Sequence, residues 1–246
     1  MNVLGLFSGI GGFELGFERA GFRIAAMYEI EPYAVAVLRR HWPDVPIFGD
    51  IRQLRGSDVG HIDVVTGGFP CQDISLAGKG AGITGSRSGL WFEYERIIGE
   101  VRPSWVVIEN VSALRSRGLE QVLGSLAALG YDAEWHCVPA SAVGAPHRRD
   151  RVWIVAYPAR LLQGRLRELL QECAGQRTLG ARDGSRADLR GHWLTEPNVG
   201  RVAHGVPARV DRLKGLGNAV VPQIPELIAR AIMAATASTQ GQAQAP

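Results

Sequence analysis

Three stretches of the sequence carry side chains that could take part in covalent or proton-transfer chemistry. Cys71 ends DVVTGGFPC, Glu109 lies near the end of the apolar run WVVIEN, and Arg149 and Arg151 open RDRVWIVA. A thiol and a carboxyl group that meet at one site can act as a nucleophile and a proton-handling group. A lone cysteine is more often a small buried side chain, so the elements around Cys71 must decide between the two interpretations.

The order of apolar runs predicts a doubly wound α/β fold that brings these residues together. Short apolar runs alternate with helical patterns along the first 156 residues, as in a parallel sheet covered by helices. The predicted strands are 3–7, 24–28, 62–66, 105–108, 131–138 and 151–156, and the predicted helices include 13–20, 33–42, 90–101, 118–129 and 224–234. Ligands of open α/β sheets bind beyond the carboxyl ends of the strands, where Cys71 and Glu109 are expected.

A glycine-rich turn and two acidic residues predict a nucleoside pocket beside this site. LFSGIGG places Gly9, Gly11 and Gly12 between the first strand and a helix N-terminus, whose free N–H groups can bind a ligand. Glu29, at the end of the second strand, can accept hydrogen bonds from ribose hydroxyls, and Asp50 could accept one from an adenine amino group. The glycine spacing differs from the GxGxxG of dinucleotide enzymes, which favours S-adenosylmethionine over NAD.

Composition bounds the protein class. The 246 residues are 46% hydrophobic and 21% charged, which suits one large globular domain. We expect no membrane segment, no signal peptide and no metal site, and the three widely spaced cysteines indicate a reducing cytoplasm. Residues 151–214 hold 12 Arg or Lys against six Asp or Glu, so they are more basic than the rest of the chain. A basic segment of this kind suits either a polyanion-binding face or a solvated surface.

The quoted residues fall within motifs that resemble the DNA (cytosine-5) methyltransferases, in their prokaryotic or phage and prophage form. The matching stretches occur in the family's order and are LFSGIGG (6–12), Glu29, GDI (49–51), GGFPCQ (67–72), ENV (109–111), RRDR (148–151) and GNAVVP (217–222). The resemblance implies a Rossmann-like, S-adenosylmethionine-dependent domain with a small target-recognition region. It divides the chain into a catalytic and cofactor-binding domain (1–158), a recognition region (159–200), a return segment (201–236) and a disordered tail (237–246).

The resemblance also implies roles for individual residues. Cys71 would add to carbon 6 of a cytosine flipped out of the duplex, Glu109 would bind ring nitrogen 3 and the amino group, Arg151 would hold the carbonyl oxygen, and Arg149 would support the nucleophile loop. The expected cofactor contacts are Phe7, Gly9, Ile10, Gly11, Gly12, Glu29, Ile30, Asp50, Ile51, Pro70, Leu90, Asn218 and Ala219. The expected DNA contacts are Ser75, Arg87, Arg201, Arg209 and Arg212.

The expected partner is double-stranded DNA, together with a cognate restriction endonuclease if the chain serves a restriction-modification system. The protein is expected to be a cytoplasmic monomer. Two residues depart from the family pattern, since Gly5 stands where Asp is usual and Ile30 stands where an aromatic residue often contacts adenine. The alternatives are an RNA cytosine-5 methyltransferase, which Phe69 disfavours, a catalytically silent DNA-binding relative, and an NAD-dependent oxidoreductase, which the glycine spacing disfavours.

Overall fold

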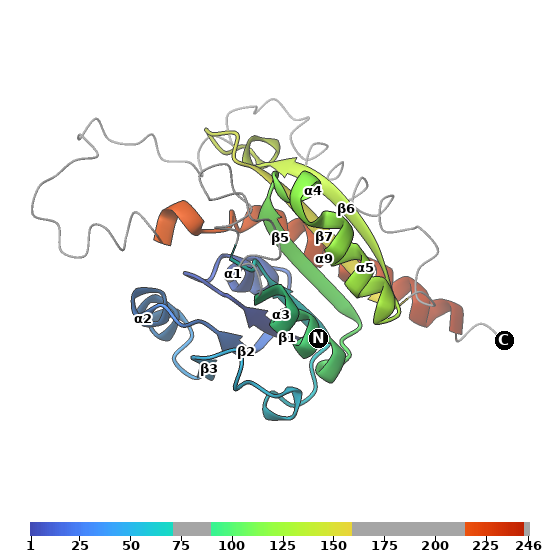
Figure 1. The fold of residues 1–246 in the computed structure, drawn as a ribbon, viewed down its shortest axis with the longest axis horizontal. Helices are drawn as coiled ribbons and strands as arrows, with labels where there is room; N and C mark the ends of the chain where they lie inside the picture. The colour runs from blue at the N-terminus through green and yellow to red at the C-terminus, as the bar shows by residue number, and fades with distance from the viewer. Residues whose placement is uncertain (71–89, 159–214, 244–246) are drawn as a thin grey trace, which may run out of the picture.

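The computed structural model describes residues 1–70, 90–158 and 215–243, with side chains to residue 237 (Figure 1). Seven strands form one sheet in the order β3-β2-β1-β4-β5-β7-β6. They are β1 (Asn2–Leu6), β2 (Arg23–Tyr28), β3 (Ile47–Phe48), β4 (Val64–Gly67), β5 (Trp105–Val111), β6 (Tyr131–Pro139) and β7 (Asp150–Pro158). The first five strands run parallel, and the chain order reverses between β1 and β4, where open sheets bind their ligands.

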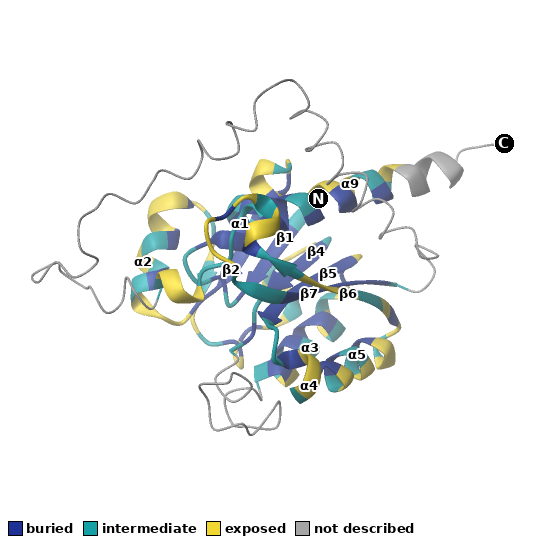
Figure 2. Ribbon diagram, turned by 90° about the horizontal axis from the view of Figure 1, so that it is seen from above, coloured by how far each residue is buried: buried dark blue, intermediate teal, exposed yellow. Residues whose placement is uncertain are grey.

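Helices cover both faces of the sheet (Figure 2). One layer holds α1 (Gly12–Arg19), α2 (Pro32–His41) and α9 (Gln223–Ala243), and the other holds α3 (Leu90–Val101), α4 (Leu114–Arg117) and α5 (Leu119–Ala128). Two short 3-10 helices, η1 (Gly56–Asp58) and η3 (Ala140–Val143), lie in connections. Successive strand residues enter opposite cores, because a strand alternates its side chains: Val107 joins the cluster under α1 and α9, whereas Val106 and Ile108 join the cluster under α3 and α5. The predicted α/β class is confirmed.

Three details differ from the sequence-based predictions. The last two strands form an antiparallel hairpin, in which β7 lies between β5 and β6 and runs opposite to both. The predicted helix 118–129 begins one residue later, because Gly118 has a φ of 146° and separates α4 from α5. Helix α9 continues to Ala243 through most of the tail that we predicted as disordered, since its alanines favour a helix even where few apolar side chains are available for burial.

No helix in the described ranges combines the length and the apolar character that a membrane crossing needs. Within the same ranges, His, Cys, Asp and Glu side chains do not gather in threes as a metal site would require.

The return segment packs closely against α1. A Cβ on Gly12 would lie 2.6 Å from the Val220 carbonyl oxygen, and one on Gly16 would lie 2.6 Å from that of Pro222. Both distances are shorter than any real Cβ contact, so these two glycines allow the backbone at residues 220–222 to approach the helix. This contact brings residues 218–220 next to the end of β1, although they lie about two hundred positions later in the chain.

Gly16→Ala is therefore expected to destabilise the fold by about 1–3 kcal/mol, because the added methyl group meets backbone that cannot move aside. Gly124→Ala is the matched control, since Gly124 is an exposed residue of α5 and a Cβ there would meet nothing within 4 Å. That control should be stabilised by about 0.5–1 kcal/mol, the usual gain from alanine in a helix. Urea unfolding of the two variants measures both changes, and a Gly16→Ala protein as stable as Gly124→Ala would contradict the packing argument.

Candidate active site

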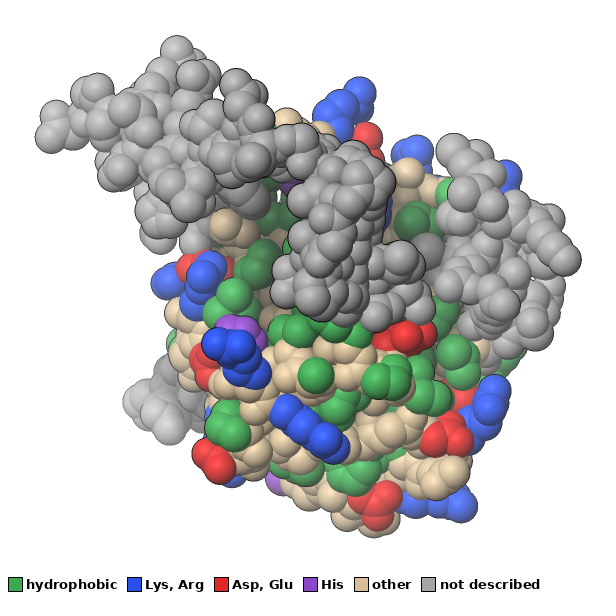
Figure 3. Space-filling view, turned by 90° about the vertical axis from the view of Figure 1, so that its left-hand side faces the viewer, with side chains coloured by type: hydrophobic (Ala, Val, Ile, Leu, Met, Phe, Trp, Pro, Cys, Tyr) green, Lys and Arg blue, Asp and Glu red, His purple; other side chains and the backbone are tan. Residues whose placement is uncertain are grey.

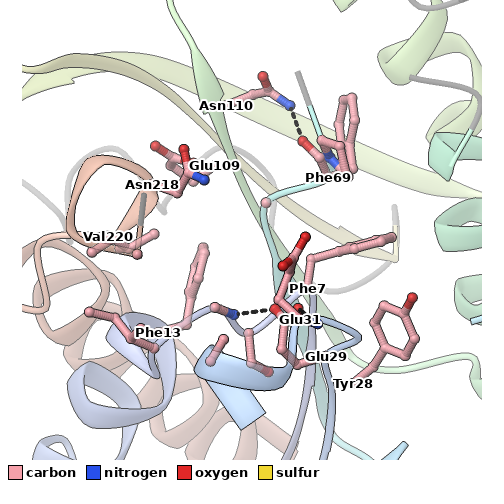
Figure 4. Close-up of a pocket in the computed structure, with 18 of the residues that line it drawn as sticks. Phe7, Phe13, Tyr28, Glu29, Glu31, Phe69, Glu109, Asn110, Asn218 and Val220 are labelled. Carbon is pink, nitrogen blue, oxygen red and sulfur yellow. Dashed lines mark hydrogen bonds between the residues drawn. The ribbon is translucent and has the colours of Figure 1, made fainter. Parts of the chain in front are cut away.

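A cavity of about 290 Å³ lies beyond the carboxyl ends of β1, β2, β4 and β5 (Figure 4). It brings together many of the predicted site residues: Phe7, Gly9, Ile10, Glu29, Ile30, Pro70, Leu90, Glu109, Arg149, Arg151, Asn218 and Ala219. Four predicted cofactor contacts, Gly11, Gly12, Asp50 and Ile51, are not among its lining residues. Cys71, Ser75, Arg87, Arg201, Arg209 and Arg212 fall outside the described residues.

Glu29 organises the end of the cavity where the sequence predicts a nucleoside. Its carboxylate is 8% exposed and accepts three backbone hydrogen bonds, from Gly9 at 2.7 Å and from Ile30 and Glu31 at 2.8 Å each. A carboxylate has about four acceptor positions, so one stays open for a ligand. We therefore expect one ribose hydroxyl, rather than both, to bond to Glu29 while this loop conformation holds.

The three glycines of the loop have different surroundings: one lines the cavity and two pack against neighbouring protein. Gly9 lines the cavity with a φ of 56°, and a Cβ there would meet nothing within 4 Å. A Cβ on Gly11, whose φ is 90°, would collide with the Trp42 ring, and Gly12 faces Val220. Gly11 and Gly12 therefore have packing roles in the fold, because the loop turns their α-carbons toward neighbouring protein. Their contact with the cofactor stays a prediction.

Asp50 and Ile51 also have local tasks. Asp50 accepts a hydrogen bond from the Arg52 backbone at 3.0 Å and one from the Gln53 amide at 3.2 Å, which fixes the turn after β3. Ile51 is 1% exposed and belongs to the core under α3. Contact between Asp50 and an adenine amino group stays a prediction.

Two glycines and one asparagine fix the chain just before Cys71. A Cβ on Gly67 would collide with the Leu6 carbonyl, and one on Gly68 would lie 3.0 Å from Glu109 Oε2. The buried Asn110 amide donates a hydrogen bond to the Phe69 carbonyl at 3.2 Å (Figure 4). The sequence GGFP therefore suits a segment that must lie tightly between β1 and the end of β5.

Glu109 and Arg151 form an ion pair at the wall of the cavity. Arg151 Nε lies 2.8 Å from Glu109 Oε1, and Arg151 Nη1 donates to the Asp150 carbonyl at 3.0 Å. The antiparallel register sets Val111 opposite Arg151, so Glu109 is a diagonal neighbour of Arg151 on the same face of the sheet. Arg149, just before β7 and with a φ of 39°, lines the same cavity.

Burial raises the pKa of Glu109 above the usual value of a carboxyl group, and the guanidinium groups of Arg151 and Arg149 offset part of this effect. An apolar surrounding disfavours the charged form of an acid, whereas nearby cations favour it. These opposed influences suit a carboxyl group that exchanges a proton with a heterocycle.

Sequence reasoning missed several lining residues. They are Ser8, Phe13, Tyr28, Glu31, Tyr33, Ala34, Gly68, Phe69, Asn110, Val111, Gly215 and Val220. Asn110 lies directly beside Glu109 and Phe69 lies directly beside Pro70, in two of the quoted motifs, so adjacency could have indicated them. Tyr33 and Gly215 meet only in the fold, where a Cβ on Gly215 would lie 3.2 Å from the Tyr33 ring.

On one described face, arginine, acidic and hydrophobic side chains are interspersed (Figure 3). Most of the basic segment that we predicted to face DNA lies in 159–214, outside the described residues. The DNA contacts therefore remain predictions.

Comparison with known proteins identifies the family. The chain is 40% identical over 164 residues to the Type II methyltransferase M2.BsuMI of Bacillus subtilis, a match that covers 63% of this chain and 42% of that protein. It is 33% identical over 171 residues to the Type II methyltransferase M.NlaIV of Neisseria lactamica, again over 63% of this chain and over 40% of the relative. The chain therefore spans less than half the length of these two relatives.

Two solved structures share the fold. A protein encoded within an E. coli prophage, assigned as a DNA modification methyltransferase, matches with a TM-score of 0.55 and 27% identity over 64% of this chain and 47% of that one. A Spodoptera frugiperda DNMT2 mutant matches with a TM-score of 0.56 and 22% identity over 66% and 51%. The model of the family described as "C-5 cytosine-specific DNA methylase" matches residues 1–170. The chain belongs to this family.

Proposed function

We propose that this chain carries the cofactor-binding and catalytic part of a DNA (cytosine-5) methyltransferase. The observation that carries the proposal is a single cavity with two chemically distinct ends. One end has the Glu29 carboxylate and the glycine loop, and the other has the Glu109–Arg151 pair beside Pro70, the residue that precedes Cys71. A nucleoside cofactor and a heterocyclic base could therefore occupy adjacent places.

The residues present fit S-adenosylmethionine. A ribose hydroxyl of the cofactor can donate to the one open acceptor position of Glu29. The apolar surface of the cofactor can contact Phe7, Tyr33 and Ile30, which is 60% exposed. The volume of about 290 Å³ is close to the lower bound for small-molecule sites. When bound, S-adenosylmethionine supplies a methyl group on a sulfonium centre, which is an electrophile.

The chain's residues supply the remaining chemistry. The Cys71 thiolate forms a bond to carbon 6 of the cytosine and breaks the 5,6 double bond, while Glu109 shares a proton with ring nitrogen 3. The electron pair released at carbon 5 takes up the methyl group, and the sulfonium sulfur would keep the electron pair of the broken carbon–sulfur bond and leave as the thioether S-adenosylhomocysteine. Loss of the carbon 5 proton to water then reforms the double bond and expels the Cys71 thiolate. The Arg151 guanidinium binds the carbonyl oxygen at carbon 2 and stabilises the negative charge that develops there.

A cytosine inside a duplex is stacked and paired, so the reaction requires the base to be flipped out, at a cost of about a few kcal/mol. We propose that phosphate contacts of the basic segment 151–214 offset this cost, and that Ser75 and Arg87 contact a phosphate or a base of the DNA. The Type II names of the relatives support a place in a restriction-modification system, and the DNA substrate supports a cytoplasmic location.

Cys71→Ser is expected to abolish methyl transfer, because a serine hydroxyl is far less nucleophilic than a thiolate at neutral pH. The wild-type protein, given S-adenosylmethionine and duplex DNA containing 5-fluorocytosine, should form an adduct that survives denaturation and maps to Cys71, because fluorine at carbon 5 blocks the final elimination. Cys137→Ser is the matched control, since Cys137 is exposed on β6 away from the cavity.

The Cys137→Ser control should form the adduct as the wild type does. Retained transfer in Cys71→Ser would refute the covalent mechanism. If the protein forms an adduct with RNA but with none of the DNA duplexes tested, the proposed substrate would have to be RNA instead of DNA.

A further inference from the structure

A buried carboxyl group lies behind the glycine loop and has no part in the mechanism above. Glu14, in the first turn of α1, is 0% exposed. Among the described residues, neither of its carboxyl oxygens has a hydrogen-bond partner. A buried polar group without a partner carries a free-energy cost, so its presence in the core calls for a physical reason.

The reason lies at Gly5 on β1. A Cβ on residue 5 would collide with Glu14 Oε1 and would lie 2.8 Å from the Ser8 hydroxyl oxygen. Glu14 and Ser8 therefore border the same small space, which exists because residue 5 is glycine. Removal of the Glu14 side chain would leave a cavity directly behind Ser8.

Ser8 is the residue through which such a change would reach the cavity. Its N–H donates to the Tyr28 carbonyl and its carbonyl accepts from Gly11, each at 3.0 Å, and its hydroxyl donates to the Gly5 carbonyl at 3.3 Å. The preceding Phe7 has a φ of 54°, a strained conformation for a bulky side chain that persists only when its surroundings enforce it. Both Phe7 and Ser8 line the cavity, whereas Glu14 does not.

We infer that Glu14 is a positioning residue of the glycine loop: its buried carboxyl group fills the space beside Gly5 and Ser8 and holds residues 7–9 in the conformation that lines the cavity. The inference rests on the proposed function only in that this loop is the one proposed to bind S-adenosylmethionine. Burial raises the pKa of Glu14 to about 7, which keeps the group neutral in slightly acidic solution and compatible with the core.

Amide hydrogen exchange in the cofactor-free protein tests the inference directly. In Glu14→Ala, the amides of residues 8–11 should exchange about tenfold faster or more, while the strands of the sheet keep their protection. Glu14→Gln keeps the volume and should exchange like the wild type. The double variant Gly5→Asp/Glu14→Ala places a carboxyl group in the same space from the other side and should return to within about threefold of the wild type.

Glu226→Ala is the matched control. Glu226 is also a buried carboxylate, 7% exposed and paired with Arg230 on α9, but it is not a cavity residue. Its loss should leave the loop amides unchanged. Unchanged loop exchange in Glu14→Ala overturns the inference, and so does faster exchange across the whole sheet, which would indicate a general loss of packing. If Glu14→Ala does not fold, the double variant decides: wild-type exchange supports the inference and failure to fold overturns it.

Calorimetric titration with S-adenosylmethionine separates the two proposals. Glu14→Ala should bind it about tenfold more weakly, because the competent loop conformation is less populated, and Glu226→Ala should bind it like the wild type. Wild-type affinity in a Glu14→Ala protein with a fast-exchanging loop would overturn the link from loop position to binding. A wild-type protein that binds no S-adenosylmethionine, while its loop responds as expected, refutes the proposed function and leaves the positioning role intact.

Discussion

Glu109→Gln is expected to lower the rate of methyl transfer by about 10²–10⁴-fold, the range found when a positioned acid or base is removed. The carboxyl group lies at the end of β5, buried and 2.8 Å from Arg151 Nε. Glutamine has a similar shape and can still bond to Arg151 through its carbonyl oxygen. It cannot share a proton with ring nitrogen 3 of a cytosine, so the loss should appear in kcat rather than in cofactor affinity.

Single-turnover methyl transfer, measured together with the dissociation constant of S-adenosylmethionine, checks this expectation. Glu134→Gln is the matched control, because Glu134 on β6 accepts a hydrogen bond from the Tyr157 hydroxyl at 2.8 Å and is not a cavity residue. It should keep full activity. Activity within about threefold of the wild type in Glu109→Gln would show that the carboxyl group takes no part in proton transfer.

The pH dependence of Glu109 follows from its raised pKa. If the protonated form is the one that binds nitrogen 3, kcat/KM falls as the pH rises through that pKa. The Glu109→Gln protein should lack this descending limb, which separates the proton-transfer role from a purely structural one.

The parallel strands and the position of the site could be predicted from the sequence. Buried parallel strands are continuous apolar runs, so β1, β2, β4 and β5 stand out. The corresponding predicted strands, 3–7, 24–28, 62–66 and 105–108, are each followed by a polar or glycine residue that had to lie at one edge of the sheet. Glu29 and Glu109 could be placed at the cavity for this reason.

The tasks of the glycines and of Glu14 could not be predicted in this way. Gly11 and Gly12 have the composition of a ligand-binding turn, but their neighbours are Trp42 and Val220, which come together only in the folded protein. Glu14 looks like an ordinary acidic residue in a first helical turn, where a carboxylate is favoured in solvent. Its burial depends on the space at Gly5, and no local pattern in the sequence reports that space.

The contact between Glu109 and Arg151 also could not be predicted from the sequence. The spacing of Arg149 and Arg151 predicted one shared face for the two side chains, and both line the cavity. Their distance from Glu109, however, depends on the direction of β7 and on its register with β5. A parallel β7 would have placed its start at the opposite edge of the sheet.

The pH dependence of stability should reveal the buried Glu14. Burial raises the pKa of Glu14 from 4.5 to about 7. The nearby Ser8 hydroxyl and the backbone N–H of Glu14 lower it in part, and the negative charge of Glu29 adds the smallest contribution, an increase. Between these two pH values the folded protein holds a proton that the unfolded chain has released. The free energy of unfolding therefore falls as the pH rises from about 4.5 to 7, by an amount on the order of 3 kcal/mol.

Urea unfolding of the wild type and of Glu14→Gln at pH 5 and pH 7.5 measures this contribution. Glutamine stays neutral, so the variant should lose less stability than the wild type over this interval, by about 2–3 kcal/mol. All other titratable groups are the same in both proteins, so their contributions cancel in the comparison.

Glu18→Gln is the matched control, because it removes a carboxyl group from an exposed position one turn later on α1, away from the space beside Gly5. Equal slopes in the wild type and in Glu14→Gln would mean that Glu14 is ionised in the folded protein at pH 5. A charged carboxylate without a hydrogen bond could not persist in that space, so its burial against Gly5 would then have to be abandoned as well.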